Sequence, residues 1–275
     1  MKRRLFCSLS PITYTISYYK EILLRKMKNL LMFWKFAKQK SEKKLPILIK
    51  KSNSLIRRRL GNVDMHLQEN KAMNLSLAAP KINNILIKPW EIFSFWKLVG
   101  NPTKKKGYQE GLTLYFDEIR SGIGGGMCQI TNLLHRLVLH SDLKIIEHHH
   151  HNRFDLFPDF KRVIPFWTGT SIMYNYFDYR VQNISKDNIY QIILYTTDQY
   201  LCGELRCLKE LKESYHIHKE HEFFSEENGQ VYRNGEIYQK VIDKKTGKIL
   251  KDELIIKNHA KVCYPTDNLI ITKLS

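Results

Sequence analysis

A run of glycines leading into an amphipathic helix is the feature that most constrains the fold. The segment GIGGGMCQITNLLHRLVLH, residues 122–140, has four glycines in its first five residues. Glycine adopts backbone angles closed to other residues, so this turn can pass close to a ligand. Apolar residues then recur with the spacing of one buried helix face: Ile130, Leu133, Leu134 and Leu137. The segment therefore predicts a tight turn followed by a helix that packs on a core.

Cys128 lies where this helix begins, which makes its thiol a candidate nucleophile. Unpaired N–H groups and the helix dipole at a helix N-terminus favour the thiolate, so we expect a lowered pKa. A proton acceptor is also needed, and the block His148–His151 follows the predicted strand KIIE, which can fold back beside the helix start. The alternative is structural, because glycine turns often serve packing and a buried cysteine is usually inert.

The net charge of +18 is concentrated at one end of the chain. Residues 1–60 carry 17 Lys and Arg against two acidic residues, whereas the other 215 residues carry 28 basic and 25 acidic side chains. Residues 17–40 have the pattern of one or two basic amphipathic helices, which LIKKSNSLIRRRL (48–60) resumes. Such helices pack on a core with a solvated basic face, lie on an anionic membrane surface, or contact nucleic acid. We do not expect nucleic acid, because the remaining sequence lacks helix-turn-helix or zinc-finger spacing.

The cysteines and the apolar segments indicate the compartment. The five cysteines have no framework spacing, which argues against a disulfide-built secreted domain. The N-terminus lacks the pattern of a signal peptide, and no stretch reaches the roughly 18 apolar residues of a spanning helix. We expect a cytoplasmic protein that is at most peripheral to the inner membrane surface. Cys202 and Cys207 lack zinc-site spacing, so neither a metal centre nor a cofactor is expected.

The remaining patterns predict an α+β fold with a helical N-terminal part, the central turn–helix–strand unit and an antiparallel β-rich C-terminal part. A helix is expected from Asp64, with Pro80 kinking or ending it. Trp90, Phe93, Phe95 and Trp96 are expected to fill the core. Residues 111–119 and 171–183 each resemble a strand, and alternating strands continue to the C-terminus. We expect three parts: a basic helical extension (residues 1–60), a core that contains the glycine turn and Cys128 (61–190) and a β-rich region packed on that core (191–275).

Several segments resemble the VanW family, which is named for an accessory protein of vancomycin B-type resistance. They are NLSLAAPKINNILIKPWEIFSFWKLVG, PTKKKGYQEGL and the GGGxCQ signature within GIGGGMCQITNLLHRLVLHSDLKIIEHHHH. The resemblance covers about residues 55–265 and implies a role in glycopeptide resistance or cell-wall metabolism. It places Gly124, Gly125, Gly126, Cys128 and Gln129 on the signature and His151 on the histidine after the helix–strand unit. The family usually has Pro-Gly at Pro89-Trp90 and Asp-Ala-Thr at Gly169-Thr170-Ser171.

Two roles for these residues remain open. In the first, Cys128 is the nucleophile of an acyl-transfer or hydrolase site for peptidoglycan peptides, with His151 as the base. Gln129 or nearby N–H groups would then stabilise the oxyanion, and Asp155, Asp159 or Asp178 would orient the imidazole. In the second, the N–H groups of Gly124, Gly125 and Gly126 form a non-catalytic binding site for an anionic cell-wall precursor. A third possibility is a membrane-surface or nucleic-acid protein that acts through residues 1–60.

Overall fold

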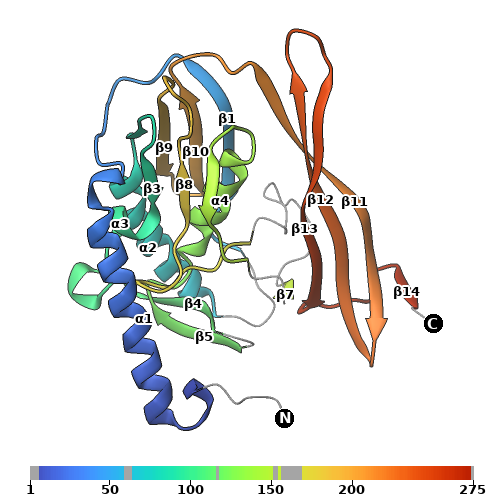
Figure 1. Cartoon of the computed structure of the whole chain (residues 1–275). Helices are drawn as coiled ribbons and strands as arrows, with labels where there is room; N and C mark the ends of the chain where they lie inside the picture. Colours follow the sequence, from blue (N-terminus) through green and yellow to red (C-terminus); the bar gives the residue numbers. More distant parts are fainter. Residues whose placement is uncertain (1–5, 59–63, 116–117, 151–153, 156–168, 274–275) are drawn as a thin grey trace.

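The computed structural model describes residues 6–58, 64–115, 118–150, 154–155 and 169–273, and its α+β class confirms the expectation (Figure 1). The helices are α1 (Pro11–Leu31), α2 (Met65–Ile82), α3 (Phe95–Val99) and α4 (Cys128–Val138). The first seven strands are β1 (Ile47–Leu55), β2 (Ile85–Ile87), β3 (Ile92–Ser94), β4 (Glu110–Tyr115), β5 (Glu118–Ile123), β6 (Lys144–Glu147) and β7 (Phe154–Asp155). The remaining strands are β8 (Arg180–Gln182), β9 (Tyr190–Thr196), β10 (Tyr200–Cys207), β11 (Glu213–Glu227), β12 (Gln230–Asp243), β13 (Ile249–Val262) and β14 (Ile271–Lys273).

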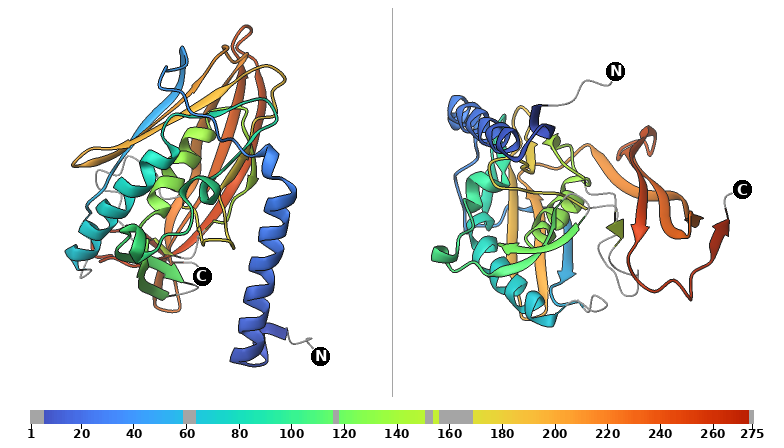
Figure 2. Two further views of the ribbon diagram at one scale, coloured as in Figure 1. Left: turned by 90° about the vertical axis from the view of Figure 1, so that its left-hand side faces the viewer. Right: turned by 90° about the horizontal axis from the view of Figure 1, so that it is seen from below.

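The core is a four-stranded antiparallel sheet in the order β1-β10-β9-β2, with α2 and α4 packed against it (Figure 2). Gly203 of β10 lies directly under α4, since a Cβ there would approach Leu137 and Leu133 to 3.0 and 3.1 Å. The opposite face of β10 carries charge, with Glu204 paired to lysines and to Arg206. One face of the sheet therefore holds the core and positions both helices.

The expected helical pattern over residues 48–60 is wrong, because residues 47–55 form strand β1. This strand pairs along its length with β10. Its buried positions include Ser52 and Ser54, and these small polar residues hide the period-two alternation from an apolar pattern search. The sheet therefore joins residues on both sides of the boundary expected near Leu60.

Two further expectations need correction. The single strand expected over residues 111–119 is a hairpin, in which β4 pairs with β5 and leads directly into the glycine turn. The strand expected over residues 171–183 is confined to β8, which lies between β3 and β6. α2 forms as expected and continues two residues beyond Pro80.

The aromatic segment before α3 is mostly in the core. Phe93, Phe95 and Trp96 are buried, whereas Trp90 is exposed and does not fill the core. Trp90 has φ +67°, a left-handed conformation that favours glycine. This turn therefore keeps a glycine-type geometry although it carries tryptophan where the family usually has glycine.

A long sheet in the order β14-β11-β12-β13-β7 lies on the side of the core opposite α1 (Figures 1 and 2). Its three long strands β11, β12 and β13 are antiparallel, and β7 and β14 add parallel edges. Gln239 of β12 donates a hydrogen bond of 2.7 Å to the carbonyl of Leu139, just after α4. This bond ties the long sheet to the end of α4.

Helix α1 is held to the core by a partly buried ion pair. Both guanidinium nitrogens of Arg25 donate to the carboxylate of Glu147 in β6, at 2.6 and 2.7 Å. Burial raises the pKa of Glu147, but hydrogen bonds from His149, Arg25 and the Asp178 N–H outweigh it and lower the pKa to about 2. The folded protein therefore favours the ionised form of Glu147 more strongly than the unfolded chain does.

We expect Glu147→Gln to loosen α1 from the core, because the amide keeps the shape of the side chain and removes its charge. In the wild type the stabilisation from Glu147 is complete above its ordinary pKa of 4.5 and is lost as pH falls toward 2. The variant should lack about 3 kcal/mol of this pH-dependent stability. Urea unfolding across that pH range and trypsin cleavage within α1 measure the effect. Glu21→Gln, on the exposed side of α1, is the control, and equal cleavage in the two variants would contradict the prediction.

Candidate functional site

The glycine turn before α4 is closed by direct backbone packing. Gly124 and Gly126 have φ +77° and +85°, which only glycine adopts without strain. Gly125 lies against β4, where an added Cβ would come within 2.1 Å of the carbonyl group of Gly111. The close approach that these glycines allow is made to the chain's own backbone, which favours the structural alternative of tight packing.

The N–H groups of these three glycines are not free, so this expectation is wrong. Each donates to a carbonyl within the chain, and the acceptors are Gln109, Gly122 and Leu112, at 2.9, 3.0 and 2.8 Å. A nest for an anion needs N–H groups that point to an open space. Those of Gly124, Gly125 and Gly126 are used to hold the turn on the β4–β5 hairpin.

Asn74 of α2 holds the glycine turn from the side that faces α2. Its side-chain amide donates to the carbonyls of Gln109 and Gly125 at 3.0 and 2.9 Å, and its oxygen accepts the N–H of Gln109 at 2.8 Å. The side chain is fully buried. All three bonds satisfy backbone groups that the turn would otherwise bury unpaired. The turn is therefore fixed between a hairpin and a helix.

Cys128 is the first residue of α4 and is half-buried. Burial raises the pKa of its thiol, while its own N–H and the charge of Lys71 act in the opposite direction. The expected lowering of the pKa by the helix N-terminus is therefore wrong as a net result. The two stabilising contributions are present, but burial outweighs them.

Lys71 is the charged neighbour of this thiol, and the sequence analysis missed it. Its aliphatic stem passes under the glycine turn, since a Cβ at Gly126 would lie 2.3 Å from its Cγ. The side chain is 7% exposed, and its ammonium donates to the amide oxygen of Gln68 at 2.6 Å. Burial and repulsion from Arg58 lower its pKa to about 7, opposed by attraction to Cys128.

A signal for Lys71 was present in the sequence. The buried face of α2 is formed by residues at helical spacing: Gln68, Lys71, Asn74, Leu75, Ala78, Ala79 and Ile82. A lysine on such a face is rarely buried unless it is paired. Within the described parts of the chain, its recorded hydrogen-bond acceptor is neutral and no carboxylate pairs with it. The position combines a buried cation with an adjacent thiol.

Gln129 is tied to the core sheet. Its amide nitrogen donates to the hydroxyl of Ser54 and to the carbonyl of Leu55, both at 2.8 Å. These bonds direct the amide toward β1 and join the start of α4 to that strand. The role of Gln129 in this geometry is to fix the helix start beside Cys128.

Asp178, the proposed orienting acid, is buried just before β8. Its carboxylate accepts hydrogen bonds from four donors: Ser94 Oγ at 2.5 Å, Trp96 N at 3.1 Å, Tyr179 N at 2.9 Å and Arg180 Nε at 2.7 Å. None of these donors is an imidazole. The carboxylate joins β3, α3 and β8, and these bonds do not connect it to Cys128.

The histidine block runs beside α4, as the fold-back of the KIIE strand predicts. The ring of His148 stacks on His135 of α4, with ring centroids 4.1 Å apart. His135 lies two helical turns beyond Cys128, roughly 10 Å along the axis. Burial and the neighbouring His150 lower the pKa of His148 to about 4, so its ring is neutral at pH 7. His151 lies outside the described residues.

The other proposed acids do not complete a triad in the described structure. Asp155 is buried in the long sheet, where its carboxylate accepts from Arg233 and Tyr264 at 3.1 and 2.9 Å. Asp159 lies outside the described residues. Among the residues that the structure describes, no group of three His, Cys, Asp or Glu side chains has an arrangement that could hold a metal ion.

The Gly169-Thr170-Ser171 segment packs on the first turns of α4. The N–H and hydroxyl of Thr170 both donate to the side-chain oxygen of Asn132, at 2.8 and 2.9 Å. The Thr170 hydroxyl also contacts that of Thr131, whose own hydroxyl donates to the carbonyl of Cys128. This segment therefore lies on the same helix face as the candidate site.

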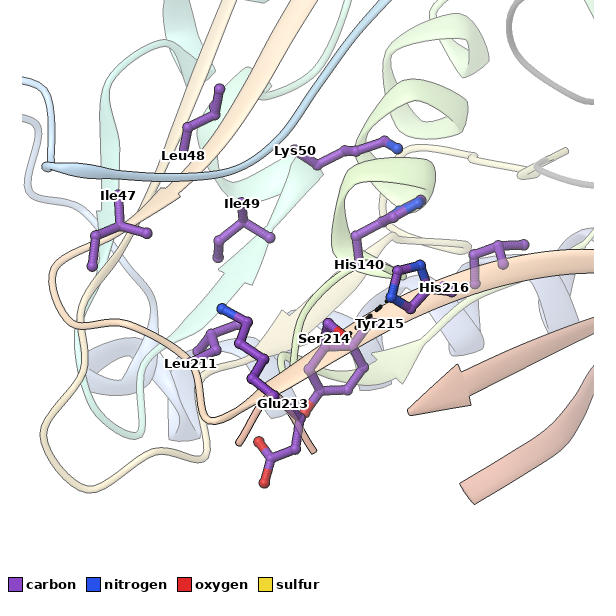
Figure 3. Close-up of a pocket in the computed structure, with 12 residues that line it drawn as sticks. Ile47, Leu48, Ile49, Lys50, His140, Leu211, Glu213, Ser214, Tyr215 and His216 are labelled. Carbon is purple, nitrogen blue, oxygen red and sulfur yellow. Dashed lines mark hydrogen bonds between the residues drawn. The ribbon is translucent and has the colours of Figure 1, made fainter. Parts of the chain in front are cut away.

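A pocket of about 420 Å³ lies away from this cluster, between β1, the end of α4 and the start of β11 (Figure 3). Its walls include Ile49, Lys50, His140 and His216. Burial, together with Lys50 and Arg136, lowers the pKa of His140 to about 4 despite a hydrogen bond with the Arg136 carbonyl. Its lining includes neither Cys128 nor Lys71, and of the histidines considered as proton partners only His140 lies there.

Comparison with known proteins gives the family. The model of VanW like proteins matches residues 70–206, a range that contains both Lys71 and Cys128. The vancomycin B-type resistance protein VanW of Enterococcus faecalis (strain ATCC 700802 / V583) is 33% identical over 230 residues, covering 84% of this chain and 83% of that protein. The uncharacterized protein YoaR of Bacillus subtilis (strain 168) is 35% identical over 85 residues, 31% of this chain and 28% of that protein. No solved structure gives a significant match. The chain belongs to the VanW family.

Proposed function

We propose that this chain is an accessory protein of vancomycin-type resistance or cell-wall metabolism, and that Cys128 acts on peptidoglycan peptides by acyl transfer or hydrolysis. The observation that carries the chemistry is a half-buried thiol whose pKa is lowered by the charge of a buried lysine, although burial of the thiol outweighs this effect. The relative in Enterococcus supplies the biological context, through the vancomycin resistance in its name.

The charge of Lys71 is the physical reason for a thiolate at this position. A buried ammonium without a counter-ion is costly, and the neutral oxygen of Gln68 only partly offsets that cost. Ionisation of Cys128 would supply an anion beside it. In this proposal Lys71, and not a histidine, is the proton partner of Cys128.

The reaction follows from this pair. The thiol proton passes to the neutral amine of Lys71, which leaves a thiolate beside an ammonium. The thiolate attacks the peptide carbonyl and forms a carbon–sulfur bond. The carbon–nitrogen bond then breaks, and the leaving amine takes the proton from Lys71. A second amine or water releases the acyl group from the sulfur.

The test is the turnover of peptidoglycan stem peptides by the purified chain, followed by mass spectrometry. We expect Cys128→Ser to lower the rate by at least about a hundredfold, because the hydroxyl is a far weaker nucleophile. Cys202→Ser, at another half-buried cysteine, is the matched control and should leave the rate unchanged. A thioester adduct at Cys128 would support the proposal. An undiminished rate in Cys128→Ser would refute it.

The role of Lys71 is tested by the pH dependence of Cys128 alkylation, which requires no substrate. Lys71→Met keeps the length of the stem and removes the charge, so the alkylation midpoint should rise by about one pH unit. His151→Gln is the comparator. A midpoint that moves with His151→Gln and not with Lys71→Met would assign the proton to the histidine. Reciprocally, Cys128→Ser should lower the pKa of Lys71, measured by NMR of the lysine side chain.

A further inference from the structure

Helix α1 is fastened to the core by an ion pair and a hydrogen bond on a side that does not carry its apolar stripe, unlike an ordinary amphipathic helix. Arg25 pairs with Glu147, and the side chain of Asn29 accepts from Arg180 at 2.7 Å. Tyr18 contacts the ring of Tyr176, with centroids 6.1 Å apart. Residues 18, 22, 25 and 29 share one helix face, and each is at least half-buried. Attachment to the core therefore leaves the apolar side of α1 uncovered.

The uncovered side is a continuous apolar stripe. Large apolar side chains between 53% and 72% exposed follow one another at helical spacing along α1: Ile12, Ile16, Tyr19, Leu23, Met27 and Leu30. Phe33 and Trp34, just beyond the helix, continue the exposed apolar surface. Figures 1 and 2 show α1 along the outside of the core with its N-terminal half extending past it. We call these eight residues the α1 stripe.

The charges around the α1 stripe point to the chemistry of its partner. Lys26 flanks it on one side and Lys20 on the other, and both are exposed. Lysines in this position extend their ammonium groups to an anionic surface while their stems cover apolar groups. Residues 1–60 as a whole carry 17 basic and two acidic side chains.

A second copy of the chain fits this surface less well. A two-helix seam repeats every 3.5 residues, and the step after Leu23 would then place Lys26 on the seam. The observed stripe instead passes through Met27, which follows the straight 3.6-residue period. Two copies would also bring two strongly basic segments together.

We propose that the α1 stripe lies flat on an anionic lipid surface. The core is attached to the side of α1 that carries Arg25 and Asn29. In the described residues, no helix is long and apolar enough to cross a membrane. A helix with one apolar side and flanking lysines instead enters the headgroup region parallel to the surface. This orientation holds the domain that contains Cys128 at the membrane.

The test is flotation of the full chain with vesicles of phosphatidylglycerol and phosphatidylcholine. We expect binding that weakens as salt rises and is much weaker with phosphatidylcholine alone. The double variant Leu23→Glu with Leu30→Glu should reduce binding at least about tenfold, because it places two carboxylates on the apolar side. The matched control is Ile249→Glu with Leu254→Glu, which has the same charge change at similarly exposed apolar residues of β13.

Binding also has a spectroscopic signature at Trp34, whose fluorescence should shift to the blue on anionic vesicles. Trp34→Phe removes that shift without altering the stripe's charge. The proposal is overturned if the wild type does not float, or if the stripe variant floats as well as the control. A dimer in solution that the stripe variant converts to a monomer would likewise overturn it, because a second copy would then cover the face.

Discussion

Gly125→Ala is expected to lower the free energy of unfolding by at least about 3 kcal/mol. The added methyl group would come within 2.1 Å of the Gly111 carbonyl group, which belongs to the backbone of β4 and cannot move aside by changing rotamer. Asn74 holds the turn from the other side, so the turn cannot lift away without losing its hydrogen bonds. Folded domains have only about 5–15 kcal/mol of stability. A large fraction of the variant should therefore be unfolded at moderate urea concentrations.

Urea unfolding followed by circular dichroism measures this effect. Gly235→Ala is the control, because its Cβ would have no neighbour closer than 3.8 Å and its backbone angles are open to alanine. The control should retain the wild-type midpoint. If Gly125→Ala also did so, the turn would not be closed on β4 as described. Alkylation of Cys128 in the remaining folded fraction then shows whether turn closure also positions the thiol.

The helices were predictable where apolar residues carry the packing. In α4 the apolar residues with helical spacing are the buried ones. The turn before α4 is fixed by the positive φ angles of Gly124 and Gly126, which require glycine. α2 begins where the sequence predicts it, and Asp64 caps it by accepting the N–H of His66 at 2.9 Å. These features depend on residues close together in the sequence, so their signal is local.

Strand β1 was not predictable in this way, because small polar side chains take the place of apolar ones on its inner side. Ser54 occupies a buried position and is satisfied by Gln129, a residue 75 positions further along the chain. A pattern search reads Ser54 as a solvated position and the surrounding lysines and arginines as a helix face. Only the pairing with β10, which is long-range, defines the strand.

The sequence predicted the position of the thiol in the candidate site, but it did not predict the thiol's pKa or its charged neighbour. Burial decides the pKa of Cys128, and burial depends on how α2 and the hairpin close over the turn. The carbonyls that accept the glycine N–H groups lie on that hairpin, so the expectation of free N–H groups failed for the same reason. Lys71 reaches the site from a helix more than fifty residues earlier in the chain.

Asp178→Asn is expected to destabilise the chain by about 3–5 kcal/mol, the cost of breaking a buried ion pair. The carboxylate accepts from four donors, including the hydroxyl of Ser94 and the guanidinium of Arg180. An amide has one oxygen to accept, and its NH2 group would face donors that it cannot satisfy. Asp187→Asn, at an exposed carboxylate paired with Lys209, is the control and should leave the urea midpoint unchanged.

The same variant separates a structural from a catalytic role for Asp178. Because none of the four recorded donors to its carboxylate is an imidazole, the pH profile of Cys128 alkylation, measured per folded molecule, should be unchanged in Asp178→Asn. An acid that orients the proton partner of a thiol would instead move the midpoint of that profile when it is neutralised. Stability and pH profile therefore respond independently: a lower urea midpoint with an unmoved profile assigns Asp178 to the joint between β3, α3 and β8. A moved profile with an intact midpoint would place Asp178 in the site itself and would contradict the assignment of the thiol proton to Lys71 alone.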